Sequence, residues 1–297
     1  LGVIVGLLST AIQGVGLTLQ RKSHLLEEEK DEYEQRRPPY RRRRWQIGMG
    51  MFLLSNIVGS TIQITTLPLP VLSTLQASGL VFNSICAAVI LKEPFTRYSL
   101  FGTVLVAGGA ILIGIYGSMN EPSHTLNELL NLLARPHFIV WLIGTAVMVL
   151  MSIVAAWAVK RFSARQSTRT RLLRGMFFGF VSGVLSAHCL LLAKSAVELL
   201  VRTIVDRRNQ FDRWQSWMIL LGLIFLALSQ LWYLHRGLKL CSTSVLYPFV
   251  FCIYNIIAII DGLIYFNQTS RLTPLHAGLV AVGTVILLAG VLALSWR

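Results

Sequence analysis

The residues of this sequence that could do chemistry are single polar side chains within long apolar runs. Asp261 is the one carboxylate that lies clearly inside such a run. In an apolar environment a carboxylate is either protonated or matched by a cation. We therefore interpret Asp261 as a candidate metal ligand, with an ion pair to Lys194 as the structural alternative.

Uncharged polar residues form stripes at helical spacing. Residues three, four and seven positions apart share one face of a helix. Such stripes can line a substrate pathway, or they can join helices by hydrogen bonds alone. The residues that we predict to line a pathway are Gln13, Asn56, Gln63, Gln76, Asn83, Tyr254, Asn255 and Asp261.

Three further charged residues are candidates for a gate or latch. Lys194 and Glu198 are four positions apart and can pair on one helix face. Glu93 ends an apolar run and could equally be an ordinary interfacial residue. We interpret His188, which lies in the same run as Lys194, as a hydrogen-bonded packing residue.

Motifs for other functions are absent from the sequence. It contains no G-x-S-x-G, H-E-x-x-H or P-loop motif, so we expect no enzyme activity and no cofactor. Cys86, Cys189, Cys241 and Cys252 stand singly, without the spacing of a zinc site. The net charge of +14 falls mostly in short loops, so we expect no nucleic-acid partner.

The composition predicts an all-α protein that crosses a membrane many times. Charged residues make up 13% of the chain and hydrophobic residues 54%, with a mean hydropathy of +0.63. Too little charge remains to solvate a protein of this size in water. Runs of about 20 apolar residues can span a bilayer. The predicted spans are 1–20, 46–66, 71–91, 100–117, 138–159, 175–197, 214–235, 244–265 and 275–296.

We predict a single transmembrane domain, 1–297, made of two halves. A first half, 1–117, contains a charged loop at 21–44 that we expect to be disordered or solvated. A linker, 118–137, leads to a second half, 138–297. Gly102 and Gly109 have the same spacing as Gly283 and Gly290, which suggests four-plus-five inverted repeats. Because Leu1 already lies in an apolar run, we expect further residues before it.

The charges of the loops predict an orientation. Most Lys and Arg residues fall in alternate loops, including 21–44 and 160–174, which places those loops in the cytosol. The N-terminus then lies outside or in a lumen, and the C-terminus lies in the cytosol. Asn267 begins the one glycosylation sequon, on the outer side. The sequence leaves open a plasma membrane or an endomembrane.

Several short stretches, taken in their order along the chain, resemble the sequence pattern of the NIPA-like magnesium transporter family, which belongs to the drug/metabolite transporter superfamily. They are residues 19–22 (Leu-Gln-Arg-Lys), residues 91–96 (Leu-Lys-Glu-Pro-Phe-Thr) before Gly102 and Gly109, residues 193–199 (Ala-Lys-Ser-Ala-Val-Glu-Leu), and the last two spans. The sequence departs from the family pattern at Asn56 and Asn267, where the family usually carries acidic residues.

The resemblance implies a drug/metabolite-transporter-type bundle that carries Mg²⁺ or another divalent cation by alternating access. One alternative is transport of a polar small metabolite, which the amide and tyrosine stripes also suit. Another is a non-transporting membrane scaffold that uses its basic loops. The expected partners are the lipid bilayer, a small cation or polar metabolite, and a second copy in a homodimer.

Overall fold

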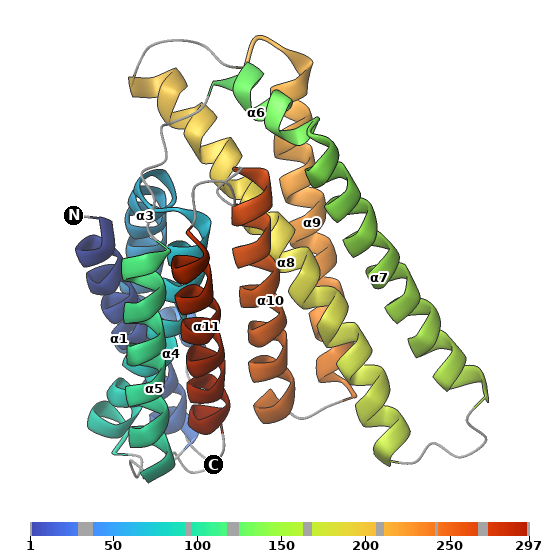
Figure 1. The fold of residues 1–297 in the computed structure, drawn as a ribbon. Helices are drawn as coiled ribbons and strands as arrows, with labels where there is room; N and C mark the ends of the chain where they lie inside the picture. Colours follow the sequence, from blue (N-terminus) through green and yellow to red (C-terminus); the bar gives the residue numbers. More distant parts are fainter. Residues whose placement is uncertain are drawn as a thin grey trace. The chain divides into compact units, whose positions relative to one another are not determined.

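The computed structural model describes residues 2–28, 38–92, 97–117, 125–162, 168–205, 211–240, 243–266 and 273–295 (Figure 1). In these ranges nine helical segments are long and apolar enough to cross a membrane, which confirms the predicted spans. Eight of them are α1 (Gly2–Glu28), α4 (Leu69–Ile90), α5 (Arg97–Tyr116), α7 (Pro136–Phe162), α8 (Thr168–Val205), α9 (Trp214–Leu238), α10 (Thr243–Tyr265) and α11 (Pro274–Ser295).

The remaining span is built from three consecutive helical pieces. They are α2 (Arg43–Leu54), the π-helical η2 (Ser55–Gly59) and α3 (Ser60–Thr66). A π-helical turn widens the helix and changes the direction of the side chains on either side of it. It lies at the polar stripe of this span, around Asn56.

The charged loop predicted at 21–44 is partly helical. The helix α1 continues to Glu28, and a short 3₁₀ turn, η1 (Pro39–Arg41), precedes α2. Glu27 is buried, with its Oε2 atom 3.6 Å from Nε of Arg42, and Arg42 also donates to the carbonyl oxygen of Ser23 at 3.3 Å. These contacts link the end of α1 to Arg42, the residue that precedes α2. Residues 29–37 lie outside the described ranges.

The predicted linker 118–137 contains a helix, α6 (Leu126–Leu133). The backbone N–H of Thr125 donates to Oε2 of Glu128 at 2.6 Å, as in a capping box. Leu126, Leu129 and Leu132 are buried along one face. The capping pair and this apolar face explain why the segment is helical although it is too short to span a bilayer.

The described helices belong to two compact units. Unit 1 comprises 1–67, 74–115 and 280–297, and unit 2 comprises 68–73 and 116–279. Unit 1 therefore combines α1, α2, α3, α5 and most of α4 and α11, whereas unit 2 contains α6 to α10 and the first residues of α4. The division into repeats at 117 and 138 stays a prediction.

In unit 1 the two glycine pairs of equal spacing, Gly102/Gly109 of α5 and Gly283/Gly290 of α11, lie in contact with each other. A Cβ atom at Gly109 would lie 2.6 Å from the carbonyl oxygen of Gly283, and one at Gly290 would lie 2.9 Å from that of Gly102. The helices α5 and α11 thus pack with their backbones in contact, which only residues without a side chain allow.

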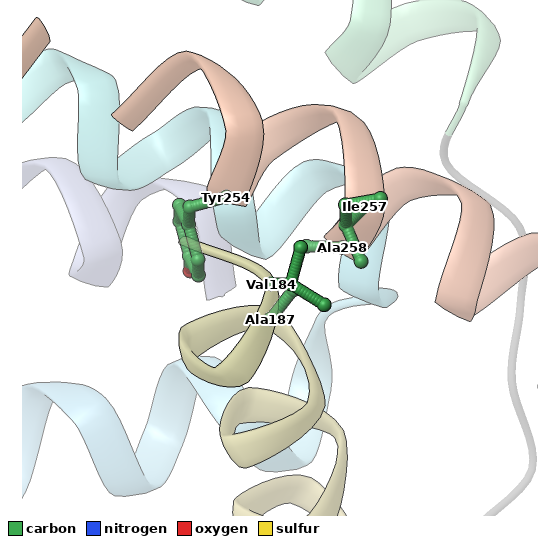
Figure 2. Packing of buried hydrophobic residues seen from close by; sticks show 5 residues of the cluster. All are labelled: Val184, Ala187, Tyr254, Ile257 and Ala258. Carbon is green, nitrogen blue, oxygen red and sulfur yellow. The ribbon is translucent and has the colours of Figure 1, made fainter. Parts of the chain in front are cut away.

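In unit 2 the helices α8 and α10 form the buried centre. Cβ atoms at Gly179 and Gly183 of α8 would lie within 3 Å of Leu246 and Ile253 of α10. Directly after Gly183, Val184 and, one turn later, Ala187 pack against Tyr254, Ile257 and Ala258 (Figure 2). By contrast, only 11% of the apolar stretch of α7 and 6% of that of α9 are buried, against 56% for α8 and 50% for α10.

The glycine contact in unit 1 makes a prediction about stability. Gly109→Ala should lower the free energy of unfolding by about 1–3 kcal/mol, because the new methyl group would overlap the α11 backbone. Gly108→Ala is the matched control, since nothing lies within 4 Å of its Cβ position. Thermal unfolding in detergent measures both variants. Equal melting temperatures would contradict the close packing of α5 and α11.

Candidate functional site

Asp261 lies at the junction of three helices of unit 2. Its side chain is fully buried. Trp141 of α7 donates its indole N–H to Oδ1 of Asp261 at 2.7 Å. His188 of α8 places Nδ1 2.9 Å from Oδ2. That short contact lacks the angles of a regular hydrogen bond, so Oδ2 has no well-formed donor among the described residues.

A second polar contact joins the same helices. Nε2 of His188 lies 3.0 Å from Oγ1 of Thr145, and Thr145 also donates to the carbonyl oxygen of Leu142. Trp141 and Thr145 are four residues apart and therefore share one face of α7. His188 is thus the hydrogen-bonded residue that its sequence context predicted, and its position beside Asp261 is an addition. We define Trp141, Thr145, His188 and Asp261 as the carboxylate cluster.

Two other pathway candidates lie on α10 near the carboxylate cluster. Tyr254 is buried in the apolar contact between α8 and α10. Asn255 is fully buried and donates to the carbonyl oxygen of Phe251 at 2.9 Å. Its Oδ1 atom is buried without a hydrogen-bond donor among the described residues. A buried acceptor in this state has an unused capacity to bind a cation, a water molecule or a donor group.

The gate candidates Lys194 and Glu198 are both buried on α8. The ammonium group of Lys194 lies 4.6 Å from the ring centroid of Phe266. Nearby, Tyr265 donates to the carbonyl oxygen of Leu129 at 3.2 Å, which ties α10 to α6. Glu93 and the sequon residue Asn267 lie outside the described ranges.

The pathway candidates of the first two spans form a separate seam in unit 1. Gln13 of α1 donates to Oδ1 of Asn56 at 3.2 Å, and Gln63 donates to Oγ of Ser9 at 2.6 Å. The backbones approach closely beside this seam, since a Cβ at Gly16 would lie 2.7 Å from the carbonyl oxygen of Gly48. Gln76 and Asn83 of α4 are instead exposed in the structure.

The described residues do not form a metal site made of side-chain charges alone. Within those ranges, no group of three or more His, Cys, Asp or Glu side chains could hold a metal ion. A cation at Asp261 would therefore meet one carboxylate, with amide, hydroxyl or water oxygens completing its shell.

Sequence reasoning did not identify Trp141 and Thr145 as parts of the site. The available signal was their four-residue spacing on an otherwise apolar helix. A single tryptophan and a threonine are common in membrane spans, however, and nothing in the sequence places α7 against α10.

Comparisons with known proteins identify a family model that covers nearly the whole chain and relatives that cover most of it. A family model described as "Magnesium transporter NIPA" matches residues 1–296. Among curated proteins of Arabidopsis thaliana, "Probable magnesium transporter NIPA1" is 21% identical over 249 residues, covering 83% of this chain and 70% of the relative. "Probable magnesium transporter NIPA4" is 22% identical, covering 83% and 68%. No solved structure gives a significant match.

The unpaired acceptor of Asn255 leads to a prediction that separates function from packing. Leu has the same branching of heavy atoms as Asn, with two methyl groups in place of the amide oxygen and nitrogen, and it removes the buried polar group, so Asn255→Leu should keep or raise the melting temperature. If the amide contributes to the pathway, solute flux should fall at least about tenfold, the scale of one lost hydrogen bond to a charged species. The neighbouring exposed residue offers Ile256→Leu as a control. Full flux in Asn255→Leu would remove Asn255 from the pathway.

Proposed function

Because this chain belongs to the magnesium transporter NIPA family, we propose that it is a membrane transporter that moves Mg²⁺ or another divalent cation by alternating access. The relatives are named as transporters and not as enzymes. We accordingly assign the chain no catalytic reaction and no resident cofactor, and we treat Mg²⁺ as its cargo.

The observation that carries this proposal is the complete burial of Asp261 among three membrane-spanning helices. A carboxylate in this position is costly, and such residues in transporters commonly lie on ion pathways. Mg²⁺ prefers oxygen ligands and is usually bound through one or two carboxylates. Asp261 supplies the negative charge that the cargo requires.

The shortage of other buried carboxylates supports a partly hydrated cargo. Within the described spans, Asp261 and Glu198 are the buried acidic residues apart from Glu27 near the end of α1. Mg²⁺ loses its water reluctantly and usually keeps several water molecules when bound. In this proposal the amide oxygen of Asn255 binds those water molecules, and the seam of Gln13, Asn56 and Gln63 has the same role in unit 1. Lys194 and Glu198 form the gate or latch.

The proposal includes an orientation, with the N-terminus outside or in a lumen and the C-terminus in the cytosol. The basic ends of α7 and α8 support it, because Lys160, Arg161, Arg169 and Arg171 are exposed without an acidic residue nearby in the sequence. We further propose that the protein acts in a plasma membrane or endomembrane as a homodimer, which its mass in detergent can check.

Asp261→Asn should abolish Mg²⁺ uptake by purified protein in liposomes that contain a magnesium indicator. The amide has almost the same shape as the carboxylate and can still accept from Trp141, but the charge that attracts the cargo is lost. Glu128→Gln is the matched control, because it makes the same chemical change in α6, outside the spans. Unchanged uptake by Asp261→Asn would exclude Asp261 from the mechanism. Flux of a polar metabolite without Mg²⁺ flux in the unmutated protein would refute the proposed cargo.

Cysteine labelling in sealed vesicles tests the orientation. In a variant without its four native cysteines, Arg161→Cys at the end of α7 should react from the cytosolic side. Asn127→Cys, in α6 before α7, should react only from the opposite side. The reverse pattern would invert the proposed topology.

A further inference from the structure

Both oxygens of the Asp261 carboxylate are covered by groups from other helices. The indole N–H of Trp141 lies 2.7 Å from Oδ1, and Nδ1 of His188 lies 2.9 Å from Oδ2. A carboxylate has about four lone-pair sites, but the side chain of Asp261 is fully buried, so a cation can reach either oxygen only if the neighbouring groups move aside. The cargo and the two side chains therefore compete for the same atoms.

The same contacts attach α7 to the centre of unit 2. Most of α7 is exposed, whereas Thr145 is buried and Trp141 is half-buried on a single face. Trp141 also packs against the apolar cluster of α8 and α10. The two polar links, Trp141 to Asp261 and Thr145 to His188, lie one helical turn apart. Breaking the first link removes half of the polar attachment of this helix.

We propose that Trp141 is a positioning residue that occupies Asp261 in the absence of cargo, so that cation binding and release of α7 from α10 are one step. The proposal rests on the proposed cation transport and adds the element that moves. His188 and Thr145 hold the second link, which keeps α7 next to α8 while the contact to α10 opens. To bind, the cation must replace the hydrogen bond between Trp141 and Asp261. The free energy of that hydrogen bond is therefore subtracted from the binding free energy of the cation.

The test compares Trp141→Phe with Trp157→Phe in the liposome assay. Phenylalanine keeps an aromatic ring against the apolar cluster but has no N–H donor. The half-saturating Mg²⁺ concentration of Trp141→Phe should fall about tenfold, the scale of a hydrogen bond to a charged group, while the maximum rate is unchanged or lower. Trp157 lies on the same helix and is 62% exposed, so its variant should match the unmutated protein.

A purely structural role for Trp141 gives a different result. Loss of packing alone would lower the amount of folded protein and the maximum rate, and would leave the half-saturating concentration unchanged. An unchanged or higher half-saturating concentration therefore overturns the proposal. Should Trp141→Phe not fold, Thr145→Val weakens the other link while retaining the shape of the side chain. Because this link holds α7 where Trp141 can reach Asp261, its loss weakens the competition with the cation and should lower the half-saturating concentration about twofold to threefold, as expected for a neutral hydrogen bond.

Hydrogen exchange separates this proposal from the proposed function. Saturating Mg²⁺ should increase deuterium uptake in peptides from α7 of the unmutated protein, and it should have no effect in Asp261→Asn. No increase, or protection of α7, overturns the release of this helix even if Mg²⁺ transport is established. If the unmutated protein transports no Mg²⁺, the proposed function is refuted. The hydrogen-exchange result then tests the Mg²⁺-dependent release of α7 independently of transport.

Discussion

A carboxylate that is buried inside a membrane protein has to be matched by donors or cations, because lipid cannot solvate it. Asp261 imposes this requirement on three helices of unit 2. Trp141 meets one oxygen from α7, and His188 lies beside the other from α8. The glycines of α8 allow α10 to approach closely enough for these contacts to form. The polar contact between α7 and α10 and the chemistry of the candidate site thus depend on one buried carboxyl group.

The two polar regions of the protein differ in their chemistry. The seam between α1 and the second span contains only neutral groups, such as the pair Gln13 and Asn56. The carboxylate cluster contains a carboxyl group and an imidazole, and two of their buried atoms, His188 Nδ1 and Asp261 Oδ2, have no regular hydrogen bonds among the described residues. Neutral amide groups are suited to joining helices and to binding the water molecules of a hydrated cargo, whereas a carboxyl group with incomplete partners is suited to exchanging its partners.

Much of the fold was predictable from the sequence, because a bilayer requires long apolar helices and their limits follow from hydropathy. The nine spans were found this way. The helix α6 was not, since its evidence is a local capping pair, Thr125 and Glu128, in a segment too short to cross a membrane. The π-helical turn at Ser55–Gly59 was also missed, because it depends on tertiary packing and leaves no periodic signal. For the site, Asp261 was identified by its isolation, but its partners come from helices that are far apart in the sequence. Only the three-dimensional packing brings Trp141 to within 2.7 Å of it.

The division of the helices between the two units also determines when unit 1 can be completed during translation. Most of α11 belongs to unit 1, yet the ribosome synthesises it after the whole of unit 2. At about 5–20 residues per second, α1 to α5 are in the membrane for roughly ten seconds or more before their last helix emerges. Throughout that interval the glycine surface of α5, which finally meets Gly283 and Gly290, has no partner from α11. Biogenesis of the N-terminal helices therefore ends with translation of the C-terminal one, and a truncation near residue 280 would leave the first half of the protein as a substrate for membrane quality control.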